Sequence, residues 1–382
     1  MAKLGDVFDL QMGKTPARAN SAYWTDGTND WVSIADLSNY EKYVDGTKER
    51  ITDLGVQESG IKKVPANTVI MSFKLSLGKT AITKTPVYTN EAIMAFLPSG
   101  KYDVYPDYFF HLFSGKDWSD GTNRAVMGAT LNKATLSNIE IDIPPLDEQR
   151  RIAAVLDKVT DLIAQRRAQL DKLDLLVKSR FVEMFGDPCN NPYGWSQKCF
   201  EEISTIITDG EHATPQRSQK GIYLLSARNI LNHAIQVDDV DYIDEVEYKR
   251  IAKRIVPEVG DVLISCSGSI GRCCVVPENF KFQMVRSVAL IRFDKCINPV
   301  FAEWLIASDE LQRQIIQSAT RSSQANLFQG KIKKLYAYVP PIELQNRFAD
   351  FVKQVKKENV TIYRSALGLE MLKKSLMQQY FE

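Results

Sequence analysis

Two tripeptides in the sequence, Gly13-Lys14-Thr15 and Gly78-Lys79-Thr80, resemble the end of a phosphate-binding loop. In such a loop, backbone N–H groups and a Lys hold nucleotide phosphates, and the full motif is Gly-x-x-x-x-Gly-Lys-Ser/Thr. Phe8 and Phe73 stand where the first Gly of that motif is required. The sequence therefore excludes a nucleotide site at either tripeptide.

Two other tripeptides carry weak catalytic signals. Asn191-Pro192-Tyr193 resembles the Asn-Pro-Pro-Tyr motif of adenine methyltransferases, but it lacks the second Pro, and no glycine-rich cofactor loop joins a strand to a helix. Glu247-Tyr248-Lys249 resembles the end of a nuclease site, but it has no Pro-Asp partner. We therefore expect a turn at the first, an exposed helix face at the second, and no catalytic residue in this chain.

Metal-ligating residues are sparse. The chain has three His and six Cys, all six Cys lie between Cys189 and Cys296, and none has a Cys-x-x-Cys spacing. This pattern predicts neither a zinc site nor a disulfide framework, but free thiols in a reducing cytoplasm. His212 lies in a polar loop, residues 209–215, whose first-half counterpart, residues 12–16, has no His and no acid. A catalytic role shared by both loops is excluded, while DNA contact by both stays open.

Overall composition is that of a globular protein. The 382 residues are 44% hydrophobic and 25% charged, with 48 Lys and Arg against 47 Asp and Glu. No apolar run is long enough to span a membrane, and the N-terminus does not resemble a signal peptide. A net charge of +1 argues against a uniformly basic coat for nucleic acid, but not against local basic surfaces.

Basic stretches recur at matching places in the two halves. Residues 59–90 contain five Lys and no acid, and residues 262–293 contain four basic residues and one acid. Residues 121–139 and 311–342 also contain basic residues and no acid. Basic residues interleaved with Asn, Gln, Ser and aromatic residues suit phosphate contact and base reading, although a basic run is more often a solvated surface. Their recurrence favours DNA contact.

The most informative feature is an internal repeat. The segment that begins Ile143-Pro-Pro-Leu-Asp-Glu-Gln matches the one that begins Val339-Pro-Pro-Ile-Glu-Leu-Gln, at an offset of 196 residues that holds to the C-terminus. Weaker similarity continues upstream, between residues 64–79 and 256–272. The repeat predicts four segments. Residues 1–143 and 187–339 each have the size of one globular domain, and residues 144–186 and 340–382 are helical spacers.

Each spacer has the pattern of one long helix. The prolines and acids at its start are helix N-terminal signals, and Gly186 and Pro188 are stop signals after the first copy. Heptad positions predict a coiled-coil core of Leu156, Ile163, Leu170, Val177, Val355, Ile362, Leu369 and Leu376. Equivalent helices related by a two-fold axis are antiparallel, so we expect an antiparallel coiled coil roughly 58 Å long. The alternative is two separate helices, each packed on its own domain.

The two large segments are rich in strands. Residues 31–34, 69–73 and 92–96 form strand-type runs in the first half, and residues 223–226, 262–265 and 287–291 match them in the second. One helix is expected near residues 106–114 and another near 299–307. The predicted fold class is α+β, with two tandem strand-rich domains, two long helices and an internal pseudo-two-fold repeat.

These residues resemble the specificity (S) subunits of type I restriction–modification enzymes over essentially the whole chain. The two Pro-Pro helix starts carry the resemblance, with Leu4-Gly-Asp-Val, Phe185-Gly-Asp-Pro and Ser323-Gln-Ala-Asn-Leu-Phe. The second copy departs from the pattern at Leu344, where Glu is expected, and Gly368 weakens the last helix by up to about 1 kcal/mol.

The resemblance implies a non-catalytic subunit with two target recognition domains, each of which reads one half of a bipartite sequence in double-stranded DNA. The helices would set the gap between the half-sites and dock two methyltransferase (M) subunits. It leaves open whether restriction (R) subunits join. S-adenosylmethionine, ATP and Mg²⁺ would be held by the partner subunits. The expected location is the cytoplasm, and no membrane partner is expected.

Recognition residues vary within this family, so candidates for DNA contact rest on charge and loop position alone. They are Lys14, Arg18, Lys74, Lys79, Arg124, His212, Arg217, Arg228, Arg272, Arg286 and Arg321. Two alternatives stay open. A methyltransferase with fused recognition domains predicts that the chain alone binds S-adenosylmethionine, and an adaptor protein predicts no salt-dependent binding to duplex DNA.

Overall fold

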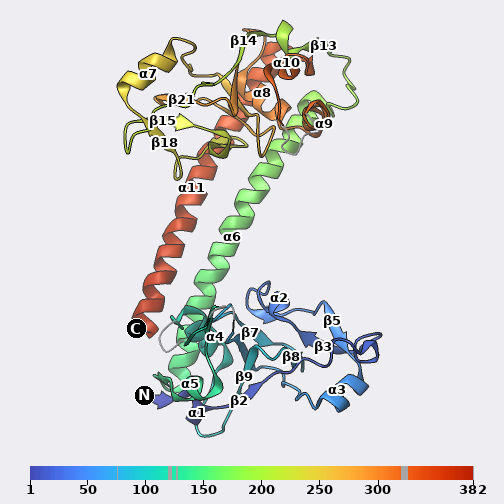
Figure 1. Ribbon diagram of the computed structural model, residues 1–382, viewed down its shortest axis with the longest axis vertical. Helices are drawn as coiled ribbons and strands as arrows, with labels where there is room; N and C mark the ends of the chain where they lie inside the picture. Colours follow the sequence, from blue (N-terminus) through green and yellow to red (C-terminus); the bar gives the residue numbers. More distant parts are fainter. Residues whose placement is uncertain (75, 119–122, 126–127, 320–325, 382) are drawn as a thin grey trace. The chain divides into compact units, whose positions relative to one another are not determined.

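The computed structural model describes residues 1–382 except 75, 119–122, 126–127, 320–325 and 382, and of residues 119–130 it describes no side chains. The chain divides into two compact units (Figure 1). Unit 1 comprises Met1–Arg167 and Arg364–Glu382, and unit 2 comprises Ala168–Tyr363. Each of the two long helices contributes one part to each unit, so the two units are described separately.

Unit 1 is built on a five-stranded sheet whose side chains are mostly buried. Its order is β2 (Phe8–Met12), β9 (Ile93–Pro98), β6 (Val69–Ser72), β7 (Thr80–Thr83) and β4 (Tyr43–Val44). The helix α4 (Pro106–Gly115) packs on this sheet, and Phe8 contacts Phe96 and Phe109 edge to face. Buried aromatic pairs of this kind make the sheet a rigid base for the loops at its edges.

A smaller three-stranded sheet lies in the same unit, with Trp31 and Ile51 fully buried in its core. Its order is β5 (Glu49–Ile51), β3 (Asn29–Val32) and β8 (Tyr88–Thr89). The remaining elements are β1 (Ala2–Lys3), α1 (Leu4–Val7), η1 (Ser21–Tyr23), α2 (Ile34–Leu37), α3 (Asp53–Ser59), β10 (Asn123–Ala125), β11 (Gly128–Thr130), α5 (Lys133–Asn138) and β12 (Glu140–Ile141).

Unit 2 repeats this architecture. Its larger sheet has the order β14 (Ser204–Asp209), β22 (Val288–Phe293), β19 (Val262–Ser265) and β20 (Cys273–Val275). The antiparallel pairings match those of β2, β9, β6 and β7, and α8 (Pro299–Ile306) stands in the place of α4. The repeat read from the sequence is therefore a repeat of the fold.

The smaller sheet is repeated as well. Its order is β18 (Asp241–Ile243), β15 (Ile222–Leu225) and β21 (Phe282–Met284), with one antiparallel and one parallel pairing as in β5-β3-β8. The remaining elements are β13 (Ser196–Cys199), η2 (Phe200–Glu202), η3 (Ala227–Asn229), β16 (Ile230–Leu231), β17 (Ala234–Ile235), α7 (Glu245–Ala252), α9 (Asp309–Ser318), α10 (Gln329–Ile332) and β23 (Tyr336–Val339).

Two predicted strands end early for the same physical reason. The strand expected at residues 31–34 ends at Val32, because Ser33 caps α2 in a capping box with Asp36. The strand expected at residues 223–226 ends at Leu225, because Ser226 forms the equivalent cap with Asn229. A side-chain oxygen that accepts a hydrogen bond from a free N–H starts a helical turn even after an apolar run. Both predicted strands are therefore too long at their C-terminal ends.

The two spacers form long helices, α6 (Leu146–Phe185) and α11 (Ile342–Phe381). In unit 1 the beginning of α6 packs beside the end of α11, where the Arg151 guanidinium lies 5.9 Å from the centre of the Tyr380 ring, and further along Arg167 forms a 2.7 Å ion pair with Glu370. In unit 2 the end of α6 packs beside the beginning of α11, where the Phe181 and Phe348 rings lie 5.4 Å apart. The predicted antiparallel pairing is confirmed.

The predicted core positions of the coiled coil fall into two groups. The side chains that face the sheet-rich ends of the helices are buried, namely Leu156, Ile163, Val177 and Val355. The other four are half-buried, namely Leu170, Ile362, Leu369 and Leu376. Leu376 packs against the core of unit 1, and polar residues at the companion heptad positions, such as Arg166 and Asn359, explain why Leu170, Ile362 and Leu369 are incompletely buried.

The Gln of each Pro-Pro motif has a structural role. Gln345 is fully buried, donates to the carbonyls of Cys296 and Pro340 at 3.0 and 2.8 Å, and accepts from the Asn298 N–H at 2.8 Å. Gln149 makes the three equivalent bonds in unit 1. Each Gln therefore fastens the start of a long helix to the loop before α4 or α8, which explains why the motif occurs twice.

Candidate nucleic-acid interface

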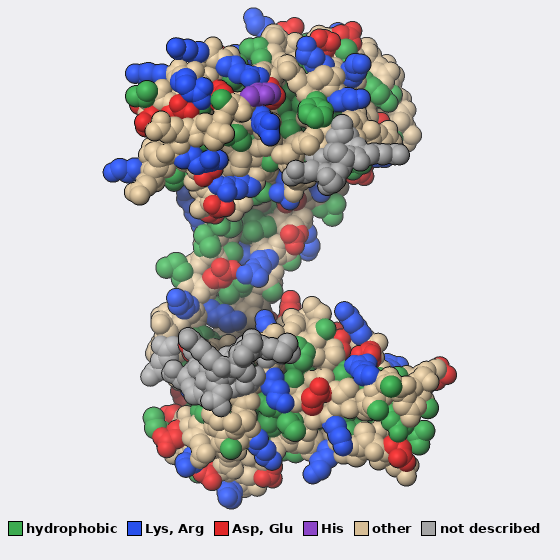
Figure 2. Space-filling model, in the orientation of Figure 1, with side chains coloured by type: hydrophobic (Ala, Val, Ile, Leu, Met, Phe, Trp, Pro, Cys, Tyr) green, Lys and Arg blue, Asp and Glu red, His purple; other side chains and the backbone are tan. Residues whose placement is uncertain are grey.

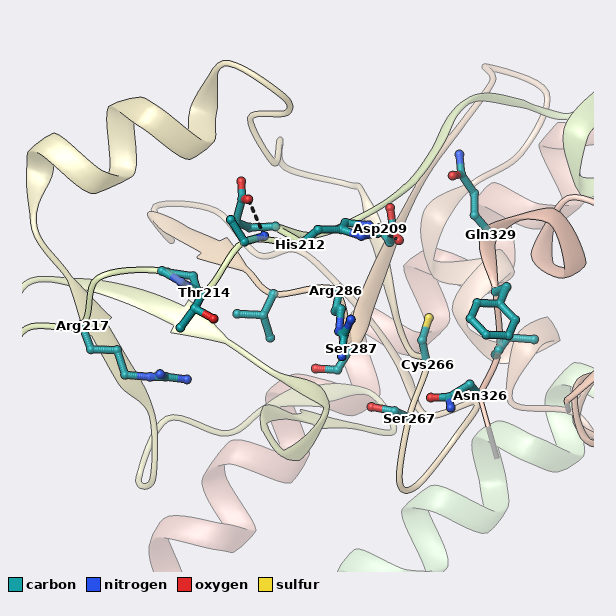
Figure 3. A pocket seen from close by; sticks show the side chains of 16 residues that line it. Asp209, His212, Thr214, Arg217, Cys266, Ser267, Arg286, Ser287, Asn326 and Gln329 are labelled. Atoms are coloured by element: carbon teal, nitrogen blue, oxygen red, sulfur yellow. Dashed lines mark hydrogen bonds and ion pairs between the residues drawn. The ribbon is translucent and has the colours of Figure 1, made fainter. Parts of the chain in front are cut away.

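A cleft of about 750 Å³ opens in unit 2 where four loops meet. The loops are residues 209–217 after β14, residues 266–267 after β19, residues 285–287 between β21 and β22, and residues 326–329 at the start of α10. Figure 3 shows Arg286 and Ser287 in the middle of the cleft, with Arg217 on one side and Cys266 and Asn326 on the other. Loops carried by a rigid sheet are the usual place for recognition residues.

Backbone hydrogen bonds hold the four loops together. Gly210 N–H donates to Val288 at 3.0 Å, Cys266 N–H donates to Ser287 at 2.8 Å, and Leu327 N–H donates to Cys266 at 2.9 Å. A Cβ on Gly210 would lie only 2.3 Å from the Met284 carbonyl oxygen, so only Gly allows this approach. The loop positions are thus fixed by the main chain, and side chains at the loop tips need not hold them.

Most charges in the cleft are already paired. Asp209 contacts both His212, at 2.7 Å, and Arg254. Glu211 accepts from the Ala213 N–H at 2.9 Å and lies 3.6 Å from Arg250.

Two arginines of the cleft differ in their pairing. Arg217 lies 3.1 Å from Asp241. Arg286 is exposed and has no ion-pair partner within the part of the chain that the structure describes. The Arg286 guanidinium is therefore available to donate hydrogen bonds to a ligand in the cleft.

Among the other candidates in unit 2, Arg228 lies away from the cleft lining. It contacts Asp239 at 3.6 Å and Asp241 at 3.3 Å, so Arg217 and Arg228 share one carboxylate. Arg272 is half-buried and does not line the cleft, and Arg321 lies outside the described residues. The structure thus brings together three predicted residues, His212, Arg217 and Arg286.

Candidates in unit 1 are more widely spread. The Lys14 ammonium donates to the Ser59 carbonyl, and Arg18 pairs with Glu49 while its guanidinium lies 3.9 Å from the centre of the Trp24 ring. These contacts hold both cations on their own domain. Lys74 is half-buried with its ammonium 5.2 Å from the Phe73 ring, and Lys79 is exposed. The side chain of Arg124 lies outside the described residues.

Sequence reasoning missed the neutral polar residues of the cleft, which are Thr214, Ser267, Ser287, Asn326 and Gln329. Their hydroxyl and amide groups donate and accept hydrogen bonds and suit base edges. Only the fold brings residue 326 beside residue 267, through an isolated bridge. The quoted Ser323-Gln-Ala-Asn-Leu-Phe motif was the one sequence signal for part of this set.

The cleft lining combines charged side chains with neutral polar ones. Burial raises the pKa of the Cys266 thiol to about 12, so the cleft offers no thiolate nucleophile at neutral pH. In the described part of the chain, no group of three or more His, Cys, Asp or Glu residues is placed to hold a metal ion. Across the face shown in Figure 2, Lys and Arg side chains are spread over the surface of unit 2 with Asp and Glu among them.

Comparison with known proteins defines the class. The family model described as "Type I restriction modification DNA specificity domain" matches residues 1–173 and 192–366. The chain therefore belongs to this family and carries two copies of its domain. The family predicted from the sequence is thereby confirmed. Separately, no helix among the described residues is long and apolar enough to cross a membrane.

Individual relatives agree along the whole chain. The MjaIX specificity subunit of Methanocaldococcus jannaschii is 25% identical over 402 residues, covering 98% of this chain and 90% of the relative. The EcoprrI specificity subunit of Escherichia coli is 21% identical and covers 90% of this chain and 84% of its own. The S subunit of M. genitalium has the same fold, with a TM-score of 0.59, 13% identity and coverage of 100% and 95%.

A second solved structure, described as showing complex assembly and conformational transition of the type I restriction–modification system, contains a chain of this fold. Its TM-score is 0.62 at 17% identity, and the match covers 99% of this chain and 96% of that one. At these identities the two structures support the fold alone.

Proposed function

We propose that this chain is the non-catalytic subunit that gives a type I restriction–modification complex its DNA sequence specificity. Each unit carries one recognition domain, and each domain reads one half of a bipartite target in double-stranded DNA. The observation that carries the proposal is the duplicated DNA specificity domain, whose loop frame is built twice by the same strand order and the same pairing.

The long helices are proposed to set the gap between the two half-sites. Each is an uninterrupted helix of 40 residues, or roughly 60 Å, which corresponds to about 18 base pairs of B-DNA. Continuous helices paired along their length are stiff, and a stiff spacer favours one fixed gap.

The same helices are proposed to dock methyltransferase subunits. They leave apolar side chains exposed, and an exposed apolar surface on a helix favours a protein partner. In unit 2 these are Leu175, Leu176, Val182, Val360 and Tyr363, and in unit 1 they are Leu367, Met371 and Leu372. Relatives named as specificity subunits of restriction enzymes support partners of this kind.

Catalysis and its cofactors are assigned to those partners. S-adenosylmethionine, ATP and Mg²⁺ would be bound by the methyltransferase and restriction subunits. The complex would act on DNA in the cytoplasm. The raised pKa of Cys266 and the neutral polar lining of the cleft support a recognition role for this chain.

Methylome sequencing of a host with and without this chain, together with its methyltransferase subunit, tests the proposal. We expect a two-part methylated motif with a fixed gap that disappears when this chain is deleted. Unchanged methylation would refute the proposed function. Binding of S-adenosylmethionine by the isolated chain would favour a fused methyltransferase, and the absence of salt-dependent binding to duplex DNA by the complex would favour an adaptor.

A further inference from the structure

Most backbone hydrogen bonds of the frame around the unit 2 cleft recur in unit 1, which sets up a residue-by-residue equivalence. The bond from the Arg286 N–H to the Glu211 carbonyl, at 3.0 Å, does not recur at Glu91 among the bonds of the described residues. Gly13 N–H donates to Ile93 where Gly210 donates to Val288, and Lys14 N–H donates to Thr89 where Glu211 donates to Met284. The approach at the first Gly is just as close, since a Cβ on Gly13 would lie 2.2 Å from the Thr89 carbonyl oxygen.

Further bonds extend the match to the second loop. Phe73 N–H donates to Ala92 in unit 1 where Cys266 donates to Ser287 in unit 2. Ile93 N–H donates to Asn90 where Val288 donates to Val285. The residues enclosed by these bonds correspond one to one, so Glu91 of unit 1 and Arg286 of unit 2 occupy the same position at the tip of the same loop.

Charge is reversed at both equivalent positions of this frame. Lys14 stands opposite Glu91 in unit 1, and Glu211 stands opposite Arg286 in unit 2. Lys14 and Glu211 are both held by their own domains, through Ser59 and through Arg250.

The loop before β9 in unit 1, residues 90–92, and the loop before β22 in unit 2, residues 285–287, each carry one exposed charge that forms no ion pair among the described residues. Glu91 and Arg286 are both exposed. The Thr15 hydroxyl donates to one carboxylate oxygen of Glu91, and the other oxygen has no hydrogen-bond partner among the described residues.

We propose that Glu91 and Arg286 read bases at equivalent positions of the two half-sites, and that they read opposite chemistry. Arg286 would contact a base edge with two acceptors, which is the major-groove edge of guanine. Glu91 would accept from an exocyclic amino group, which on the major-groove edge of cytosine is the N4 donor. This inference rests on the proposed function and specifies how it is carried out.

The negative charge of Glu91 distinguishes a contact with a base from a contact with a phosphate. A carboxylate is repelled by phosphate oxygens, so an acid at the tip of a DNA-facing loop suits only a donor on a base or a bound water. Because Arg286 stands at the same place in the same frame, it is expected to face a base edge too. Two copies of one fold would in this way read unlike half-sites.

The test uses the whole complex in a host that expresses this chain with its methyltransferase subunit. The variants are Glu91→Gln and Arg286→Gln, which remove each charge but keep a polar side chain of similar size. Glu41→Gln in unit 1 and Lys295→Gln in unit 2 are matched controls, because both residues are exposed and neither lies at the frame. Methylated sites are read by sequencing genomic DNA.

We expect Arg286→Gln to relax one base position in one half-site only, with a loss of about 5- to 150-fold in discrimination against the wrong base. The other half-site and the gap stay unchanged. Glu91→Gln gives the converse result in the other half-site, and neither control changes the motif.

Two results would overturn the inference: an unchanged motif, or uniformly weaker methylation of all sites with the same base preferences, which marks a phosphate contact. If methylation is lost altogether, competition binding of the purified complex to duplexes substituted at each half-site position gives the same decision. Failure of the proposed function is recognised separately, because the unaltered chain would then give no two-part motif at all.

Discussion

Replacing Gln345 by Leu should destabilise unit 2 more than any other single change at the helix start. The substitution keeps the size of a fully buried side chain but removes three hydrogen bonds of 2.8–3.0 Å. The carbonyls of Cys296 and Pro340 and the Asn298 N–H lose this partner, and an unsatisfied buried group costs about 1–3 kcal/mol. Allowing for partial solvation, we expect a loss of about 4 kcal/mol, or roughly 12 °C in melting temperature.

Differential scanning calorimetry measures this loss, and the repeat supplies its own controls. Gln149→Leu removes the equivalent bonds in unit 1, so it should lower a different unfolding transition by a similar amount. Gln354→Leu lies on the exposed face of α11 and should change stability by less than about 0.5 kcal/mol. If Gln345→Leu is no more destabilising than Gln354→Leu, the buried amide does not fasten the helix and the reasoning fails.

Three further changes probe the charge network, the loop frame and the spacer. Burial alone would raise the pKa of Asp157, but hydrogen bonds from His111 and Lys42 lower it overall. The stabilisation is therefore fully present above the ordinary Asp pKa of 3.8 and declines as the pH falls below it toward the lowered value. Urea titrations should show Asp157→Asn about 1–2 kcal/mol less stable than the parent chain at pH 7, with a smaller difference at pH 3. Gly210→Ala should abolish methylation, because its Cβ would force the cleft loops apart. Gly330→Ala, with open space around its Cβ, should leave methylation unchanged. Equal methylation by complexes that carry the two variants would contradict a rigid frame. Deletion of one heptad from each long helix shortens the spacer by about 10 Å, so the methylated motif should lose about 3 base pairs of gap with both half-sites intact, and an altered half-site would contradict the spacer role.

The features that repeat in the sequence were predictable, because duplication amplifies a weak signal. The helix starts at Pro144 and Pro340, the heptad stripes and the antiparallel pairing all depend on apolar spacing that two copies share. Helix α9 (Asp309–Ser318) was missed because its counterpart in the first half is not a helix among the described residues, so repetition gave no support.

The recognition cleft was predicted only in part, because charge can be read from sequence whereas pairing cannot. Arg18 and Arg217 carry the right charge, but Glu49 and Asp241 lie within ion-pair distance of them, which no local pattern announces. Glu91 was not a candidate, because the candidates were chosen by positive charge and the equivalence of Glu91 to Arg286 is visible only in the fold. That equivalence depends on contacts between segments far apart in the chain.

The two recognition frames show how one duplicated fold separates stability from specificity. The bonds that hold the loops are backbone to backbone, and the close approaches are made at glycines, so neither depends on the side chains at the loop tips. Glu91 and Arg286 differ by two units of charge, yet the bonds of Gly13 and Ile93 match those of Gly210 and Val288, and only the Arg286 N–H adds a bond, to Glu211 at 3.0 Å. If the proposed base contacts are made, a substitution at this tip would change which base edge is complementary and leave the packing of the sheet untouched, because the tip is exposed and the sheet beneath it is buried. On the proposed function, specificity would then be free to diverge between the halves while the frames that carry the tips stay alike.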